Sequence, residues 1–173
     1  VFISINPEEN VMRIETKNIS FHYNGVWALR NVTFDVDSGD MIAIIGQNGS
    51  GKSTLLKCLN GILKVDEGKI EIGGRSLARI SSRELSRLMA YIPQSEENTM
   101  GINVFDTVLL GRKPYIKGRP SSGDLEIVAG LLSRLELEPI AMRNMDTLSG
   151  GQQQRVFIAR ALAQQPSILL LDE

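Results

Sequence analysis

The sequence predicts an α/β fold, and three observations support this prediction. Residues 41–45 form a continuous apolar run with the length and β-branched content of a strand buried on both faces, and residues 168–171 form a second such run. Between these runs, apolar residues recur at helical spacing. Before the first run, apolar and polar residues alternate as in a half-buried sheet. A chain of 173 residues is long enough to bury a core as one domain with a subdomain.

The composition narrows the class of function. Lys and Arg total 19 while Asp and Glu total 20, so charge gives no reason to expect binding to nucleic acid or to a strongly anionic membrane. The single cysteine, Cys58, excludes an internal disulfide, and we expect it to be a small buried hydrophobe. The apolar runs stay well short of the about 18 residues of a membrane-spanning helix, and no secretory signal is visible. The chain begins at Val1 rather than Met and stops directly after an apolar run, so we expect both ends to be cut.

The N-terminal part predicts an antiparallel sheet. Residues 1–10 show no periodicity and are predicted to form a tail, whereas residues 12–16, 19–23 and 32–37 alternate as strands. Asn24-Gly25 is a hairpin turn signal between two of them. Tyr23 ends its strand and is either an ordinary strand aromatic or a stacking platform for a base. His22, the only histidine, has no assigned role.

The pattern Gly46-x4-Gly51-Lys52-Ser53 follows the first buried run and is the phosphate-binding loop of nucleoside triphosphatases. Its glycines remove Cβ atoms that would keep backbone N–H groups away from a triphosphate, and the helix beginning near Lys52 points its positive end at the same place. A helix dipole contributes only about 0.3–2 kcal/mol, whereas a unit charge about 4 Å away contributes roughly 4 kcal/mol. Lys52 should therefore dominate phosphate binding, and the Ser53 hydroxyl should hold Mg²⁺.

The helix after this loop should place four apolar side chains inward and end at Gly61. These side chains belong to Leu55, Leu56, Leu59 and Ile62. Residues 68–74 then predict a short strand and a Gly-Gly turn, and residues 81–89 a short helix with Leu85 and Leu88 inward. A strand ends at Pro93, and the adjacent Gln94 on its own indicates only a solvated loop residue.

Residues 103–145 predict an inserted helical subdomain. A first helix, indicated by Val104, Val108 and Leu109, cannot continue past Pro114. A second helix begins with a capping box at residues 121–124. Its inward side chains are predicted to be Leu125, Val128, Leu132 and Leu135.

Two further features carry polar chemistry. Ser149 and Gln152 have the spacing of an N-cap and its N3 partner, but Gly150 and Gly151 between them each weaken a helix by up to about 1 kcal/mol. Exposing helix N–H groups and a hydroxyl to an anion would justify that cost. Asp172 and Glu173 end the second buried strand and are costly there unless they meet cations. If this strand lies beside residues 41–45, Asp172 faces the Mg²⁺ and Glu173 can orient and deprotonate the attacking water.

Together these residues resemble the ATP-binding-cassette ATPases, the motor domains of ABC transporters. The resemblance covers the chain from about Met12, and its most specific motif is residues 148–152. It implies a P-loop NTPase fold, truncated at the C-terminus, with an antiparallel β subdomain at 11–40 and a helical subdomain at 99–163. The RecA-like core would comprise residues 41–98 and 164–173.

The resemblance also implies roles for individual residues. Tyr23 would stack on adenine, Gln94 would be the Q-loop glutamine near metal and water, and Glu173 would be the catalytic base. Catalysis would rest on Lys52, Gln94 and Glu173, and the metal on Ser53, Gln94 and Asp172. The nucleotide-binding residues would be Tyr23, Gly46, Gln47, Asn48, Gly49, Ser50, Gly51, Lys52, Ser53, Thr54, Ser149, Gly150, Gly151 and Gln152.

The family works as a head-to-tail dimer in which the Ser149-type motif of one copy closes on the γ-phosphate held by the other. The resemblance therefore implies ATP and Mg²⁺ as cofactors and a second copy of the chain as a partner. It also implies transmembrane permease subunits, an indirectly acting substrate-binding protein, and a place on the cytoplasmic face of the membrane. Residues 107–115 look like the subgroup that imports iron-siderophores, haem or cobalamin.

Other interpretations stay open. The chain could be a soluble ABC ATPase without a membrane partner. It could also be a nucleotide-binding module without turnover, because the family's γ-phosphate histidine region does not follow Glu173 and His22 is in the wrong place to replace it. We expect the fragment alone to bind nucleotide weakly at most. A P-loop kinase or GTPase is disfavoured, since neither needs a Ser-Gly-Gly-Gln helix cap. The sequence does not name the cargo.

Overall fold

The computed structural model describes residues 1–5, 12–94 and 101–172. The chain divides into two compact units, and each is described by itself. The first comprises residues 1–91 with 167–173, and the second comprises residues 92–166.

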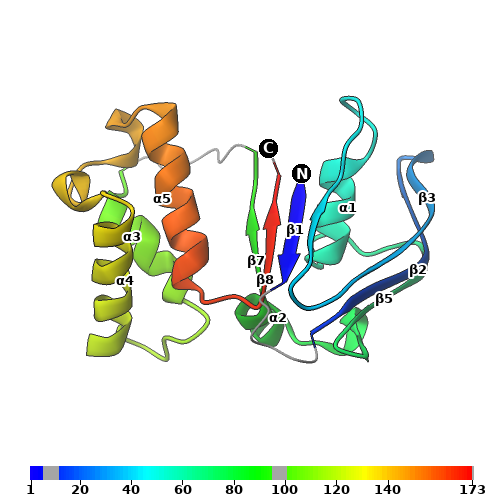
Figure 1. Cartoon of the computed structure of the whole chain (residues 1–173), viewed down its shortest axis with the longest axis horizontal. Coiled ribbons are helices and arrows are strands. Elements are labelled where there is room, and N and C mark those ends of the chain that lie inside the picture. Colours follow the sequence, from blue (N-terminus) through cyan, green and yellow to red (C-terminus); the bar gives the residue numbers. More distant parts are fainter. Residues whose placement is uncertain (6–11, 95–100, 173) are drawn as a thin grey trace. The chain divides into compact units, whose positions relative to one another are not determined.

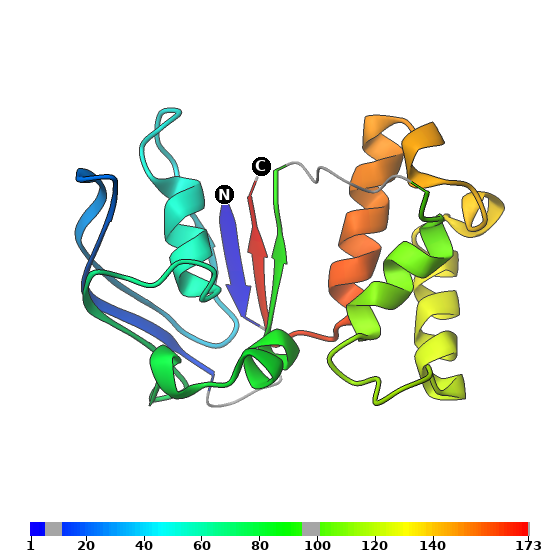
Figure 2. The same ribbon diagram turned by 180° about the vertical axis from the view of Figure 1, so that it is seen from behind.

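The first unit contains a four-stranded sheet with the N-terminal strand in its interior. The strand order is β4 (Met41–Ala43), β1 (Phe2–Ile5), β8 (Ile168–Leu171), β7 (Met89–Ile92). β1 runs antiparallel to both neighbours, with Ile3 opposite Ile42 on one side and Leu170 on the other. Figures 1 and 2 show β1 and β8 side by side. The predicted N-terminal tail is therefore wrong for residues 2–5. Val1, Ile3 and Ile5 alternate inward, a pattern too short to stand out beside the polar residues that follow.

The prediction for residues 41–45 also needs correction. The strand ends at Ala43 and lies at the edge of the sheet, with Met41 74% and Ile45 93% exposed, so it is not buried on both faces. β8 is not its neighbour, because β1 separates the two strands. An apolar run that leads into a loop can have the same length and composition as a strand buried on both faces. Neither property therefore distinguished the two cases for residues 41–45.

A second, antiparallel sheet has the order β3 (Val26–Val36), β2 (Ile14–Tyr23), β5 (Glu67–Ile72), β6 (Arg75–Ser76). The predicted hairpin is confirmed, since Asn24 and Gly25 have φ values of 47° and 83°, as a type I′ turn requires. The two strands predicted at residues 12–16 and 19–23 are one strand, β2, whose pairing is irregular beside Asn18. The predicted strand and Gly-Gly turn at residues 68–74 correspond to β5 and its turn into β6.

Helix α1 (Lys52–Leu59) lies between the two sheets (Figures 1 and 2) and buries Leu55, Leu56 and Leu59. Gly61 follows the helix with φ 68°. Its N–H donates to the carbonyl of Cys58, and the next N–H donates to that of Lys57, which makes a Schellman motif. Ile62 therefore lies beyond the helix and is 56% exposed, contrary to prediction. Burial of Cys58 is confirmed and raises the pKa of its thiol to about 11.

The core of the first unit is built from both sheets and α1. Its buried side chains include Ile3, Ile14, Val36, Leu56, Ile72 and Leu170. A 3₁₀ turn (Leu77–Arg79) and helix α2 (Ser82–Leu88) connect β6 to β7. Ser81 caps α2 by accepting a hydrogen bond from the N–H of Glu84, and Leu85 is buried as predicted.

The second unit is helical, and its helices pack together (Figure 2). It consists of α3 (Val104–Leu109), a 3₁₀ turn (Leu110–Arg112), α4 (Ser122–Arg134), two further 3₁₀ turns (Glu138–Ile140 and Met145–Thr147) and α5 (Gly150–Ala163). The capping box at Ser121 is confirmed, with Asp124 as its N3 partner. Val128 and Leu132 are buried as predicted, but Leu125 is 41% exposed because the helix turns Asp124 inward instead.

Asp124 is turned inward because Arg112 is buried beside it. The guanidinium donates to Asp124 from Nε at 2.9 Å, and to the carbonyl of Ala163 and the side chain of Gln165 from Nη1. It also stacks on Tyr115, with 4.1 Å from Cζ to the ring centre. Arg112 thus links the start of α4 to the last carbonyl of α5. None of the helices in the described ranges is long and apolar enough to cross a membrane.

Candidate functional site

The predicted phosphate loop leaves β4 and enters α1 through strained backbone that glycine permits. Gly51 is the N-cap of α1 with φ 91°, and a Cβ atom there would lie 2.4 Å from the carbonyl oxygen of Ala28. The loop therefore approaches β3 more closely than any other residue type would allow. Gly49 has φ 80° but has open space around it among the described residues. Both features match a loop that presents its backbone rather than its side chains.

Lys52 folds its side chain back over this loop. Its Nζ donates hydrogen bonds to the carbonyl oxygens of Gly46 and Gln47, each at 2.9 Å. The ammonium therefore lies close to the positive end of α1, whose first turn, residues 52–54, contains no carboxylate. Two positive features at one place favour an anion, as predicted for this loop.

The structure brings Ser53 and Asp172 together although 119 residues separate them. The Ser53 hydroxyl donates to Oδ1 of Asp172 at 2.8 Å, so the carboxylate at the end of β8 reaches the start of α1 even though β8 and β4 are not neighbours. Asp172 is only 8% exposed. This pair confirms the predicted approach of the terminal carboxylate to the phosphate loop, by a route that the predicted strand order did not contain.

Tyr91 completes this cluster and was not predicted. Its hydroxyl donates to Oδ2 of Asp172 at 3.0 Å from the neighbouring strand β7. Burial, together with this bond to the carboxylate, raises the pKa of Tyr91. The sequence offered only a strand aromatic two residues before Pro93, and nothing in that pattern indicates a partner 81 residues away.

The donor set fits a magnesium ion better than a metal that needs several protein ligands. Among residues 1–5, 12–94 and 101–172, no three His, Cys, Asp or Glu side chains form a metal-binding group. Mg²⁺ typically takes one or two protein groups together with substrate phosphates and water. A hydroxyl and a buried carboxylate beside a phosphate loop are such a set.

Tyr23 lies at the tip of the hairpin and is 46% exposed. Its ring packs edge-to-face against that of Phe21, with 4.8 Å between the ring centroids. Val26 pairs with it across the turn and is 72% exposed. Two residues further along β3 is Ala28, the residue against which Gly51 packs. β3 thus pairs with Tyr23 through Val26 and approaches the phosphate loop through Ala28.

The cap predicted at Ser149 is confirmed in the second unit. The Ser149 hydroxyl accepts from the N–H of Gln152, and the Gln152 side chain accepts from the N–H of Ser149, at 3.3 and 3.0 Å. A Cβ atom at Gly150 or Gly151 would have no described atom within 4 Å, and neither glycine has a positive φ. The packing within this unit therefore gives no reason for either glycine.

Two predicted residues, Gln94 and Glu173, lie at or beyond the ends of the described ranges. Gln94 is exposed and is the last described residue before the gap at 95–100. Glu173, the predicted base, lies outside the described residues.

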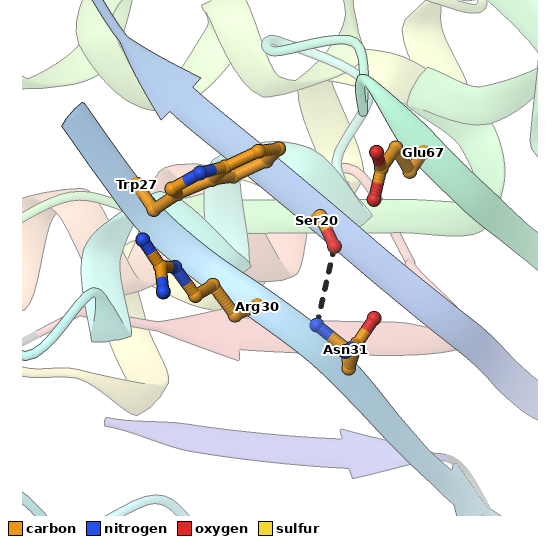
Figure 3. A pocket seen from close by; sticks show the side chains of 5 residues that line it. All are labelled: Ser20, Trp27, Arg30, Asn31 and Glu67. Atoms are coloured by element: carbon orange, nitrogen blue, oxygen red, sulfur yellow. Dashed lines mark hydrogen bonds between the residues drawn. The ribbon is translucent and has the colours of Figure 1, made fainter. Parts of the chain in front are cut away.

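A pocket that the sequence did not indicate lies on the second sheet. Figure 3 shows its lining, with Trp27 and Arg30 projecting from β3, Glu67 from β5, and a hydrogen bond from the N–H of Asn31 to the Ser20 hydroxyl. Its volume is about 220 Å³. None of these residues belongs to the phosphate loop, so the pocket is separate from the predicted site.

Comparison with known proteins places the chain in context. The family model described as ABC transporter matches residues 29–173. An uncharacterized ABC transporter ATP-binding protein of Methanocaldococcus jannaschii is 45% identical over 95% of this chain and 64% of its own length. A protein of Helicobacter pylori named as a probable iron chelatin transport ATP-binding protein is 38% identical over 94% of this chain and 65% of its own length.

Two more similarities are informative. A manganese transport system ATP-binding protein of Synechocystis is 40% identical over 92% of this chain and 62% of its own length. A solved inward-facing ABC transporter assigned to the metal-chelate type matches with a TM-score of 0.76 and 35% identity, over 94% of this chain and 60% of that chain. The chain therefore spans somewhat less than two thirds of the length of these proteins.

Proposed function

Because the chain belongs to the ABC transporter ATP-binding family, we propose that it binds ATP with Mg²⁺ and hydrolyses it to drive import through a separate membrane permease. The observation that carries this proposal is the cluster at the start of α1. Lys52 curls over the glycine loop, and Ser53 is hydrogen-bonded to the buried Asp172. Such a cluster suits a triphosphate with its metal.

In this proposal each residue of the loop has a distinct task. Backbone N–H groups of residues 46–54 surround the β and γ phosphates, and the Lys52 ammonium exchanges its two carbonyl partners for phosphate oxygens. Ser53 and Asp172 hold the metal, with Gln94 as a further contact. Mg²⁺, when bound, neutralises charge on the phosphates. Tyr23 stacks on the adenine, for which its exposed ring at the hairpin tip is suited.

Turnover is proposed to need two copies of the chain. Glu173 orients and deprotonates the attacking water, and the Ser149 cap of a second copy, with Gly150, Gly151 and Gln152, closes on the γ-phosphate. Support for this comes from the glycines in the cap, which the packing of their own unit does not explain. As the proposed division we retain a β subdomain at 11–40, a core at 41–98 and 164–173, and a helical subdomain at 99–163. The second compact unit, residues 92–166, overlaps the proposed helical subdomain. β5 and β6 fall within the proposed core but lie in the same sheet as β2 and β3.

We propose a metal chelate as the cargo, such as an iron-siderophore, haem or cobalamin. Support comes from the iron chelatin and metal-chelate relatives, while the manganese relative shows that similar chains are named for other metal cargo. Residues 107–115 are weaker support for assignment to the metal-chelate subgroup. Arg112 and Tyr115 in this segment donate hydrogen bonds to the carbonyls of Ala163 and Gln164 at the end of α5, so both have a structural role. The proposed location is the cytoplasmic face of the membrane, with a substrate-binding protein acting indirectly.

The test compares nucleotide binding by the wild-type protein with binding by Lys52→Ala. We expect the variant to lose at least about tenfold in ATP affinity, because roughly 4 kcal/mol of charge attraction is removed before solvent compensates for part of it. Isothermal titration calorimetry with ATP measures this directly, and Lys57→Ala on the same helix is the control. Equal affinities for wild type and Lys52→Ala would contradict the site.

A soluble ABC ATPase without a membrane partner is the alternative function. The relatives named for transport favour the transporter. Purification of the native protein from detergent-solubilised membranes distinguishes the two, since an importer subunit should copurify with a polytopic permease. Recovery free of any membrane protein, under conditions that preserve such complexes, would favour the soluble alternative.

A further inference from the structure

Both oxygens of the Asp172 carboxylate are held by hydroxyl groups from different elements. Ser53 on α1 bonds Oδ1 at 2.8 Å, and Tyr91 on β7 bonds Oδ2 at 3.0 Å. A carboxylate held at one oxygen only can still rotate about its Cβ–Cγ bond. Two bonds on opposite oxygens define its plane, and the burial of Asp172 keeps water from replacing either bond freely.

The two hydroxyls are not equivalent. The Ser53 oxygen is the group proposed to contact the metal, so its position depends on whether metal and nucleotide are bound. The Tyr91 ring is partly buried and packs against the core of the first unit, so its position is set by the fold. The Tyr91 hydroxyl therefore keeps its position in the nucleotide-free and nucleotide-bound states, whereas the position of the Ser53 hydroxyl depends on the metal.

We propose that Tyr91 is a positioning residue for the Mg²⁺ site. Its hydroxyl orients the Asp172 carboxylate toward Ser53 before nucleotide binds. This rests on the proposed function, because it assigns a task at the same site. Groups that orient a metal ligand from behind typically contribute 10–100-fold to metal affinity. Tyr91 donates one neutral hydroxyl, so its effect belongs at the low end of that range.

The experiment measures how much a divalent ion strengthens nucleotide binding. A fluorescent, non-hydrolysable ATP analogue is titrated into the full chain, once with EDTA and once with Mn²⁺, for wild type and Tyr91→Phe. The variant keeps the ring and its packing but loses the hydroxyl. We expect the Mn²⁺ enhancement to fall about tenfold in Tyr91→Phe while the affinity in EDTA stays unchanged.

A matched control is Tyr115→Phe. It also removes a tyrosine hydroxyl that donates a hydrogen bond, in this case to the carbonyl of Gln164 at 2.9 Å in the second unit. We expect its Mn²⁺ enhancement to equal that of wild type. A thermal melt of each variant, together with unchanged affinity in EDTA, shows that the Tyr91→Phe site is folded.

The outcomes separate this inference from the proposed function. If wild type responds to Mn²⁺ and Tyr91→Phe responds equally, the role of Tyr91 is wrong and the nucleotide site stands. If the affinity in EDTA falls with the Mn²⁺ enhancement intact, Tyr91 supports the loop rather than the metal, and the inference is overturned as well. If wild type binds no nucleotide, the proposed function and this inference fail together.

Discussion

At the scale of single residues, Gly51 meets two requirements at once, and each can be tested separately. Its φ of 91° strains any side chain, and a Cβ atom would also lie 2.4 Å from the Ala28 carbonyl oxygen. Gly51→Ala should destabilise the protein by more than about 1 kcal/mol and weaken ATP binding, since the loop must move away from β3. Urea unfolding and calorimetry measure the two effects.

Gly49→Ala is the matched control for the close contact. Gly49 has φ 80° but no described atom within 4 Å of an added Cβ, so this variant introduces strain alone. We expect a smaller loss of stability than for Gly51→Ala. Equal losses for both variants would show that the approach of the loop to β3 does not matter.

Asp124 predicts how stability depends on pH. Hydrogen bonds from the Ser121 hydroxyl and backbone N–H, and then from Arg112, lower the pKa of this carboxyl to about 2. Its unfolded value is about 3.9, so the ionised group stabilises the folded state above about pH 4, and that contribution is lost as pH falls from 4 through 2. In Asp124→Asn the free energy of unfolding should be lower at pH 7 and should decrease less between pH 4 and 2.

Urea titrations at pH 7, 4, 3 and 2 measure this dependence. Asp146→Asn, which changes an exposed carboxylate in the same unit, is the control for general charge effects. If Asp124→Asn loses stability toward acid as steeply as wild type, other carboxylates determine the acid sensitivity.

At the scale of elements, α5 begins with two glycines that its own packing does not require. Gly150→Ala places a methyl group where no described atom lies within 4 Å, so it should stabilise the helix by up to about 1 kcal/mol. If the cap instead meets a phosphate of a second copy, the same methyl group obstructs that contact and lowers ATP turnover. We therefore expect a variant that is more stable and less active.

Ser121→Ala provides the comparison for this helix-start argument. Ser121 makes a capping box at the start of α4 just as Ser149 does at the start of α5, but its motif has no proposed nucleotide role. Its loss should cost about 1 kcal/mol of stability with turnover per folded molecule retained. Undiminished turnover in Gly150→Ala would refute the proposed contact.

Local chemistry made some elements predictable and others not. The caps at Ser121 and Ser149 and the Asn24-Gly25 turn follow from interactions over three or four residues, so the sequence indicated them correctly. β1 is a strand because Ile3 finds partners 39 and 167 residues away, in Ile42 and Leu170. No local pattern contains that pairing, and the edge position of β4 follows from it.

The candidate site divides in the same way. The phosphate loop and its lysine lie within eight consecutive residues, 46–53, and their pattern predicted them. The role of Tyr91 depends on β7 lying beside β8, which is a property of the sheet. The same sheet brings Asp172 to Ser53, although the strand order that we expected was different.

At the scale of the whole molecule, the proposed site combines the phosphate loop, in the first compact unit of one copy, with the Ser149 cap, in the second compact unit of another copy. Glu173→Gln, made in the whole protein, tests this arrangement. The amide cannot take a proton from water, so hydrolysis should stop while ATP binding remains, and a dimer closed on uncleaved ATP should accumulate. Size-exclusion chromatography of the variant with ATP and Mg²⁺ should show a dimer that is absent with ADP. Lys52→Ala on the same column should stay monomeric with either nucleotide. Continued phosphate release by Glu173→Gln would contradict the assignment of Glu173 as the base. A Glu173→Gln monomer that retains bound ATP would contradict a site shared between two copies.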